Sequence, residues 1–202
     1  MGRARAAIGR ATVRTGRFFT RARAKTFSLA ASGAFASFGV RSVIEPPVRL
    51  LGEARISIGD DVFVGAGSWL QTLDGPGHAG VLEIGDGTSI AGQCVLSAAC
   101  SVRLGRKVLF ARNVYISDHI HSYDDTTRAV LDQGIARLEP VEIRDGAWLG
   151  QNVVVCPGVT IGRGSVVGAN AVVLEDVPDH CLAVGAPATV VRRFALEPET
   201  AL

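Results

Sequence analysis

Two histidines lie close together in a polar segment of this 202-residue chain, and they are the first side chains that suggest chemistry. The segment reads Ser117-Asp118-His119-Ile120-His121-Ser122-Tyr123-Asp124-Asp125 and holds two of the chain's four histidines. An imidazole titrates near neutral pH and can take a proton from a reacting hydroxyl group. Histidines in a polar loop are also commonly just solvated side chains. The surrounding sequence has to decide between these two interpretations.

The elements that position this segment follow a six-residue period. Aliphatic residues or Phe occupy every sixth position in blocks, and Gly follows directly at eight of these anchor positions. The anchors are Phe38, Ile44, Leu50, Ile58, Val64, Leu70, Ile84, Ile90, Leu96, Leu104, Phe110, Ile116, Ile143, Leu149, Val155, Ile161, Val167 and Val173. A period of six fits neither an α-helix nor an antiparallel meander. It predicts a triangular β-solenoid, in which three six-residue units make one coil and coils stack about 4.8 Å apart.

The sequence therefore predicts an all-β fold, a parallel β-helix of about six triangular coils with a short basic N-terminal segment and an extended loop. We expect three parts: a basic arm over residues 1–37, the β-helix over 38–178, and a C-terminal cap and tail over 179–202. The period is interrupted by excursions at 71–83 and 117–142. Long loops on a regular scaffold are commonly functional, and the second excursion contains both histidines.

Composition agrees with this fold and excludes several classes of protein. Gly accounts for 24 residues and aromatics for only 6 %, which favours tight turns and a narrow interior over a helical bundle. No run reaches the ~18 apolar residues of a membrane span. The four cysteines lack the spacing of a metal site or a disulfide framework, so we expect no metal and a cytoplasmic location.

Charge separates the arm from the rest of the chain. Residues 1–25 carry eight basic side chains and no acid, so the net charge of +2 conceals an acidic body. Such a body is not a nucleic-acid-binding domain. Five basic residues of the arm would form one stripe on a helix, and such a helix could contact the inner face of a membrane: Arg10, Arg14, Arg17, Arg21 and Lys25. A frayed, solvated arm and a cleaved targeting segment are the alternatives.

Further motifs resemble the hexapeptide-repeat acyltransferases, more narrowly the maltose/galactoside O-acetyltransferases and their polysaccharide O-acetyltransferase relatives. The resemblance covers about residues 38–194 and rests on the repeats, the Asp118–Asp124 loop, and three motifs: Ala147-Trp148-Leu149-Gly150, Pro157-Gly158-Val159-Thr160-Ile161-Gly162 and Gly185-Ala186-Pro187-Ala188. It implies a left-handed β-helix and direct transfer of an acetyl group from acetyl-CoA to a hydroxyl of a sugar or polysaccharide precursor. It also implies a homotrimer with acetyl-CoA between subunits. The acceptor could be a free, nucleotide-linked or lipid-linked saccharide.

The resemblance also implies roles for particular residues. The family's general base is matched by a His followed three residues later by an Asp, which points to His121 and Asp124. Asp118 would orient the ring or contact the acceptor, and His119 is the alternative base. Four residues match the family's acetyl-CoA contacts: Trp148, Gln151, Ala169 and Arg192.

The chain departs from the galactoside enzymes at three places. Leu174-Glu175 and Thr189 stand where phosphate-contacting residues are expected, and Ala91 stands where an acceptor-binding Asn is expected. The first two departures leave the family's phosphate contacts to acetyl-CoA partly missing, and Ala91 favours the polysaccharide branch of the family.

Two other functions compete with acetyl transfer. A non-catalytic β-helix scaffold would share the repeat but not an intact His loop. A zinc enzyme like the γ-class carbonic anhydrases would need three histidines, and His78, His119 and His121 supply the number but not that family's ligand spacing.

Overall fold

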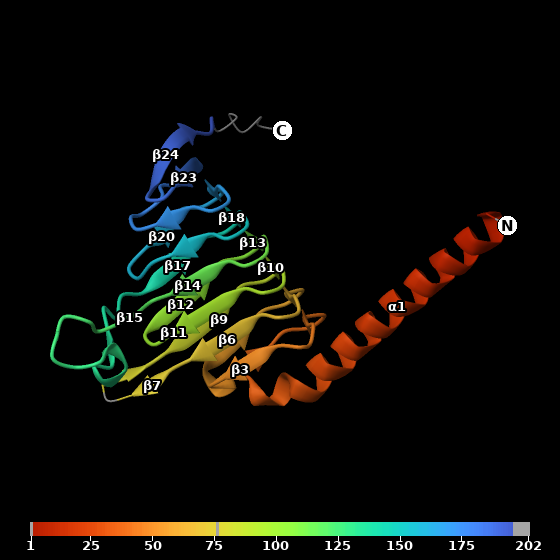
Figure 1. Cartoon of the computed structure of the whole chain (residues 1–202), viewed down its shortest axis with the longest axis horizontal. Helices are drawn as coiled ribbons and strands as arrows, with labels where there is room; N and C mark the ends of the chain where they lie inside the picture. Colours follow the sequence, from red (N-terminus) through yellow and green to blue (C-terminus); the bar gives the residue numbers. More distant parts are fainter. Residues whose placement is uncertain (1, 76, 196–202) are drawn as a thin grey trace, which may run out of the picture.

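The computed structural model describes residues 2–75 and 77–195, and its centre is a triangular prism of short parallel strands (Figure 1). Successive strands of the chain cross three sheets in turn, which we call faces A, B and C. Each strand pairs in parallel with the equivalent strand of the next coil, except the last strand of the chain, which pairs antiparallel with the strand before it. The parallel β-solenoid predicted from the six-residue period is confirmed.

The strands of the three faces have the following bounds. Face A comprises β1 (Ser37–Phe38), β4 (Ile56–Ile58), β9 (Val81–Ile84), β12 (Ser101–Leu104), β17 (Val141–Ile143) and β20 (Thr160–Ile161). Face B comprises β2 (Val43–Ile44), β5 (Phe63–Val64), β10 (Ser89–Ile90), β13 (Leu109–Phe110), β18 (Trp148–Leu149), β21 (Val166–Val167), β23 (Cys181–Gly185) and β24 (Ala188–Arg193). Face C comprises β3 (Arg49–Leu51), β6 (Trp69–Thr72), β11 (Val95–Ala98), β14 (Tyr115–Ser117), β19 (Val154–Val155) and β22 (Val172–Val173).

The predicted anchors form the core of the prism. All of them are buried except Phe38 and Leu50. These two belong to the first coil, are only partly buried, and pack against the end of the core. Strand register aligns the anchors in columns, for example Ile90 beside Val64 on one side and beside Phe110 on the other. Burying each such side chain contributes about 1.5–3 kcal/mol, so the column rather than any single strand stabilises the prism.

Close contact between stacked turns explains the glycines that follow the anchors. A Cβ built on Gly150 would lie 2.7 Å from the Ala169 nitrogen, and one built on Gly65 would lie 2.5 Å from the Gly92 nitrogen. Real Cβ atoms do not approach backbone this closely. Glycine at these positions therefore lets one coil rest directly on the next.

A long helix, α1 (Gly2–Ala31), precedes the prism and continues into the short turn η1 (Ser32–Ala34). Its last part covers the N-terminal end of the prism, where Ala24, Ser28 and Phe35 are buried. The Ser28 hydroxyl accepts a hydrogen bond from the Ile44 N–H at 2.8 Å, which fixes the helix to β2. The helical alternative for the basic arm is therefore the one observed. Within the described residues, no helix combines the length and hydropathy that a membrane span requires.

Both loop excursions leave the prism at the same edge, after a strand of face C. The first follows β6 and contains the hairpin of β7 (Asp74–Gly75) and β8 (His78–Ala79). The second follows β14 and contains β15 (Ile120–His121), η3 (Val130–Asp132) and β16 (Ile135–Ala136). A short turn, η2 (Glu53–Arg55), links faces C and A in an earlier coil. Figure 1 shows β7 and β15 on one side of the prism and α1 on the other.

Candidate active site

A cavity of about 460 Å³ opens on face C beside the second excursion. Outward-facing side chains of β6, β11 and β14 line it, and the excursion closes one side. Aromatic, hydroxyl, amide and imidazole groups all contribute to the lining: Trp69, Gln71, Ser97, Tyr115, His119 and His121. A cavity with apolar walls and a few polar groups is typical of a small-molecule site.

Asp118 and His119 form a hydrogen-bonded pair at this cavity. His119 Nδ1 lies 2.8 Å from Asp118 Oδ1, and the side chains are 10 % and 0 % exposed, respectively. An ionised carboxylate only accepts hydrogen bonds, so Nδ1 of a neutral His119 carries the hydrogen and Nε2 is left as the acceptor. The pair therefore has the form of a general base whose tautomer is fixed by a carboxylate.

Backbone N–H groups of the preceding coil hold the carboxylate in place. The Ala99 N–H donates to Asp118 Oδ1 and the Cys100 N–H donates to Oδ2, both at 2.8 Å. Burial by itself raises the pKa of Asp118, but the hydrogen bonds from His119, Ala99 and Cys100 outweigh it and hold the pKa below its usual value. Asp118 is therefore a buried anion that faces His119 across a hydrogen bond.

His121 lies on the same cavity but in a different environment. It belongs to β15, where it pairs with Ile135, and it is exposed. Asp124 is also exposed. Across residues 2–75 and 77–195, the structure has no hydrogen bond or ion pair from the His121 ring or the Asp124 carboxylate. The structure thus brings His119 and Asp118 together and leaves His121 and Asp124 without a shared contact.

A short polar ladder leads along face C to the pair, and the sequence analysis did not identify it. Gln71 Nε2 donates to Ser97 Oγ at 2.6 Å. Ser97 is in register with Ser117, whose hydroxyl donates to the His119 carbonyl oxygen at 2.8 Å. Gln71, Ser97 and Ser117 each directly follow the third anchor of a coil. The polar residue repeated at that position is the sequence signal that could have identified the ladder.

The residues matched to acetyl-CoA contacts lie on face B and at the edge between faces B and C. Trp148 is an exposed residue of β18, and Arg192 lies in β24. Gln151 and Ala169 lie in stacked turns, since the Asn170 N–H donates to the Gln151 carbonyl oxygen at 2.8 Å. His119 lies beyond the opposite edge of face C. Within one chain, these four residues and His119 are therefore on different sides of the prism.

The structure also places the third histidine of the zinc alternative. His78 is in β8, at the tip of the first excursion. Among the residues that the structure describes, no three His, Cys, Asp or Glu side chains are grouped to hold a metal ion.

Comparison with known sequences identifies the repeat. A model for bacterial transferase hexapeptides, built of six repeats, matches residues 140–175, and a model for the hexapeptide repeat of succinyl-transferases matches residues 55–72. An Escherichia coli K12 protein, WbbJ, is 32 % identical over 158 residues, covering 75 % of this chain and 79 % of that protein. It is provisionally named a lipopolysaccharide biosynthesis O-acetyl transferase. The chain belongs to the hexapeptide-repeat acyltransferase family. Membership carries the left-handed winding that the resemblance implied.

Two other similar proteins extend the comparison. A Mycobacterium tuberculosis protein, provisionally named an acetyltransferase, is 38 % identical over 143 residues, which are 71 % of this chain and 46 % of that protein. The chain thus spans about half the length of this curated relative. The hexapeptide-repeat acetyltransferase of Vibrio cholerae, solved with acetyl-CoA, superposes with a TM-score of 0.51 and 29 % identity, covering 84 % of this chain and 76 % of that one.

Proposed function

We propose that this protein transfers an acetyl group from acetyl-CoA to a hydroxyl of a sugar or polysaccharide precursor. The observation that carries the proposal is the buried Asp118–His119 pair at a cavity of about 460 Å³. Family membership supports the reaction class. The name of the Escherichia coli relative supports a saccharide acceptor, and the Vibrio cholerae structure supports acetyl-CoA as the donor.

The pair has the properties that O-acetylation requires of a protein. Acetyl-CoA supplies a carbonyl that is already activated as a thioester, so the difficult partner is the neutral hydroxyl. His119 Nε2 takes the hydroxyl proton as the oxygen bonds to the acetyl carbon, and it gives that proton to the thiolate as the C–S bond breaks. Asp118 stabilises the imidazolium that exists between these two steps. No covalent acetyl-enzyme forms during this transfer.

We assign the base to His119 in preference to His121, the residue that the sequence analysis favoured. A general base is effective when its ring is held in one orientation. Asp118 holds the His119 ring, whereas the His121 ring has no partner within the described residues. His121 lines the same cavity and is assigned to the acceptor side of the site, with Asp124 next to it. Ser97 and Gln71 are placed to hydrogen-bond further acceptor hydroxyls.

The proposal requires a second copy of the chain. Residues matched to acetyl-CoA contacts are on face B or its edge, so they reach His119 only if face B of one subunit lies against face C of another. The outward side chains favour that contact: face B exposes Leu109 and Trp148, face C exposes Tyr115, and face A carries ion pairs such as Arg103–Glu83. We propose a homotrimer in which each active site is shared by two subunits.

Within this trimer, the residues of face B would bind acetyl-CoA from one side of the groove. Trp148 offers a flat apolar surface to the pantetheine arm, with Gln151 and Ala169 beside it at the edge. Arg192, exposed in β24, offers a guanidinium to the phosphates.

The cysteines among the described residues are all free thiols, which agrees with a reducing compartment such as the cytoplasm.

A thiol-release assay with acetyl-CoA and a panel of free, nucleotide-linked and lipid-linked sugars tests the proposal. We expect thiol release that depends on a saccharide acceptor, and binding of CoA in calorimetry. A protein that binds no CoA and releases no thiol with any acceptor would be a scaffold instead.

A further inference from the structure

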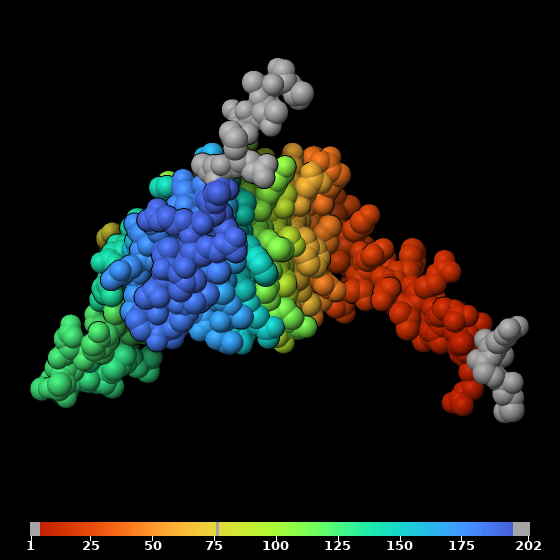
Figure 2. Space-filling view, turned by 90° about the horizontal axis from the view of Figure 1, so that it is seen from above, coloured from red at the N-terminus to blue at the C-terminus, as the bar shows by residue number. Residues whose placement is uncertain are grey.

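Most of helix α1 packs against no other part of the described structure. Every residue from Arg5 to Arg21 is exposed, whereas Ala24 and Ser28 near the C-terminal end of the helix are buried against the prism. Figure 2 shows the helix standing away from the prism, on the side opposite the second excursion. A free helix of this length with Gly9 and Gly16 in it is only marginally stable in water, so a surface that binds it would stabilise it.

Helix α1 carries an exposed apolar stripe along its length. At about 100° per residue, Ile8, Phe18, Phe19 and Leu29 fall within one third of the helix circumference. Their side chains are 64–80 % exposed. Ala24 and Ser28, which contact the prism, lie on the opposite side of the helix. The stripe therefore faces away from the body of the protein.

Basic residues border this stripe on both sides. One flank carries a row at spacings of three and four: Arg10, Arg14, Arg17, Arg21 and Lys25. The other flank carries Arg5 and Arg23, of which Arg23 donates to the Pro46 carbonyl oxygen at the base of the helix. No acidic residue precedes Glu45 in the chain. Like charges at these spacings destabilise an isolated helix, and an anionic surface removes that repulsion.

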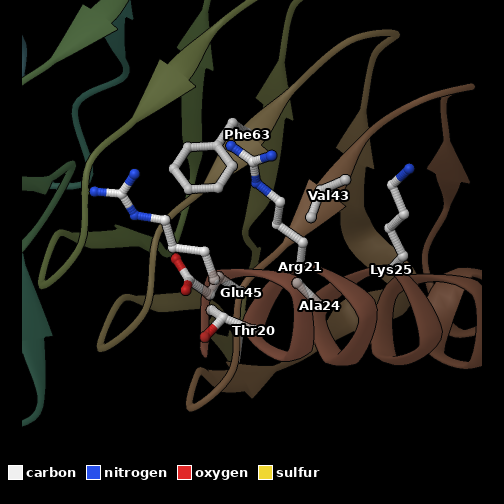
Figure 3. Close-up of a pocket in the computed structure, with 8 residues that line it drawn as sticks. Thr20, Arg21, Ala24, Lys25, Val43, Glu45 and Phe63 are labelled. Atoms are coloured by element: carbon white, nitrogen blue, oxygen red, sulfur yellow. The ribbon is translucent and has the colours of Figure 1, made fainter. Parts of the chain in front are cut away.

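The basic row continues into a groove between α1 and face B, with a volume of about 490 Å³. Figure 3 shows Arg21 and Lys25 extending from the helix over Val43 and Phe63, with Glu45 at the side. Among the described residues, Arg21 and Lys25 form no ion pair, nor does Arg17 at the same groove. The groove therefore offers cations above an apolar floor, a combination that suits a phosphate group attached to a hydrocarbon.

We propose that α1 binds the surface of an anionic phospholipid membrane. The stripe of Ile8, Phe18, Phe19 and Leu29 enters the boundary between headgroups and acyl chains, and the basic flanks and the groove meet headgroup phosphates. The prism stands above the helix, away from the bilayer. An acid-free helix alone would also suit a nucleic acid, but the apolar stripe, on the side away from the prism, would then have no function.

Vesicle co-sedimentation with the full chain tests this proposal. We expect binding to vesicles of phosphatidylcholine mixed with phosphatidylglycerol, little binding to phosphatidylcholine alone, and weakening as NaCl is raised. Arg14→Gln/Arg21→Gln should bind about 25-fold more weakly, since each cation near an anionic surface contributes about fivefold. Lys107→Gln/Arg112→Gln is the matched control on the prism, and its binding should not change.

A second pair of variants tests the stripe itself. Ile8→Ser should weaken vesicle binding at least several-fold, whereas Val13→Ser, which removes a 53 % exposed aliphatic residue from the other side of the same helix, should not. In Ile8→Trp, vesicles should shift the fluorescence to shorter wavelength, and in Val13→Trp they should not. Equal binding to neutral and anionic vesicles, no binding, or equal effects of the two serine variants would overturn the proposal. So would a change of oligomeric state in Ile8→Ser with vesicle binding intact, because α1 would then dock on a second copy.

Discussion

His119 Nδ1 lies 2.8 Å from an oxygen of Asp118 that also accepts the Ala99 N–H at 2.8 Å. The histidine is thereby connected through one carboxylate oxygen to the backbone of the preceding coil. Its ring orientation depends on how two coils stack and not only on the loop that carries it. This connection separates His119 from His121 and leads to the predictions that follow.

Removal of the imidazole should abolish acetyl transfer without affecting the fold. We expect His119→Ala to lower kcat about 10²–10⁴-fold, the usual contribution of a general base. CoA affinity in calorimetry should stay unchanged. His121→Ala, on the proposed acceptor side, should raise the KM for the acceptor and keep kcat within a few-fold of the parent. The reverse pattern, an inactive His121→Ala beside an active His119→Ala, would return the role of base to His121 and Asp124.

Asp118→Asn should impair both catalysis and stability. The amide keeps the shape of the carboxylate, but its NH₂ group cannot accept a hydrogen bond from a backbone N–H, so the bond from either Ala99 or Cys100 is lost. We expect kcat to fall at least tenfold and Tm to fall measurably. Asp124→Asn, on an exposed carboxylate of the same loop, serves as the comparison. If both variants keep the parent Tm and kcat, Asp118 does not hold the histidine.

Stability should depend on the charge of Asp118 at acidic pH. The pKa of this carboxyl is lower in the folded protein than its ordinary value near 3.8, so the unfolded chain binds its proton first as pH falls. The stabilisation is therefore complete above about pH 5, where the unfolded carboxyl is also ionised, and it disappears as pH falls through the folded-state pKa. Thermal melts between neutral pH and pH 3 should show a smaller loss of Tm in Asp118→Asn than in the parent. Parallel curves would contradict the assignment of a buried anion.

A shared active site predicts complementation between two inactive variants. His119→Ala removes the base, and Trp148→Ala removes the proposed acetyl-CoA contact on the other subunit. Co-expressed chains that mix at random into trimers should recover about a quarter of parent activity, because that share of interfaces has both residues intact. Mixing the purified homo-oligomers without exchange is the control and should give none. A site contained in one subunit would show no recovery in either case.

The six-residue period was sufficient to predict the prism because each anchor reports a local requirement: a large apolar side chain that points inward every sixth position. The ring partner of His119 was harder to infer. Asp118 is adjacent in sequence, but the donors that fix it are the N–H groups of Ala99 and Cys100, which carry no side-chain signal. Both donors lie in the step of eight residues between the anchors Leu96 and Leu104, where the regular spacing of six is interrupted.

In the basic arm, too, the sequence predicted one part of the structure and left another part open. Residue spacing predicted that the basic residues from Arg10 to Lys25 would form one row if the segment were helical. The sequence left open whether the segment was helical. Which side of that helix is free depends on the burial of Ala24 and Ser28, and both are small residues that periodicity alone does not mark as a contact. The packing of these small side chains against the prism, rather than helix propensity, determines which side of α1 stays exposed.

Both excursions leave the prism at the edge that follows face C, while the strands on either side keep their register. In a solenoid each coil depends only on its neighbours, and lengthening a loop costs little free energy. Insertions at this edge can therefore change in length and sequence during evolution without disturbing the stacking of the coils. Under the proposed function, a lineage could acquire a new acceptor by altering residues 71–83 or 122–142, while Asp118, His119 and the proposed donor-binding side of the molecule stay unchanged.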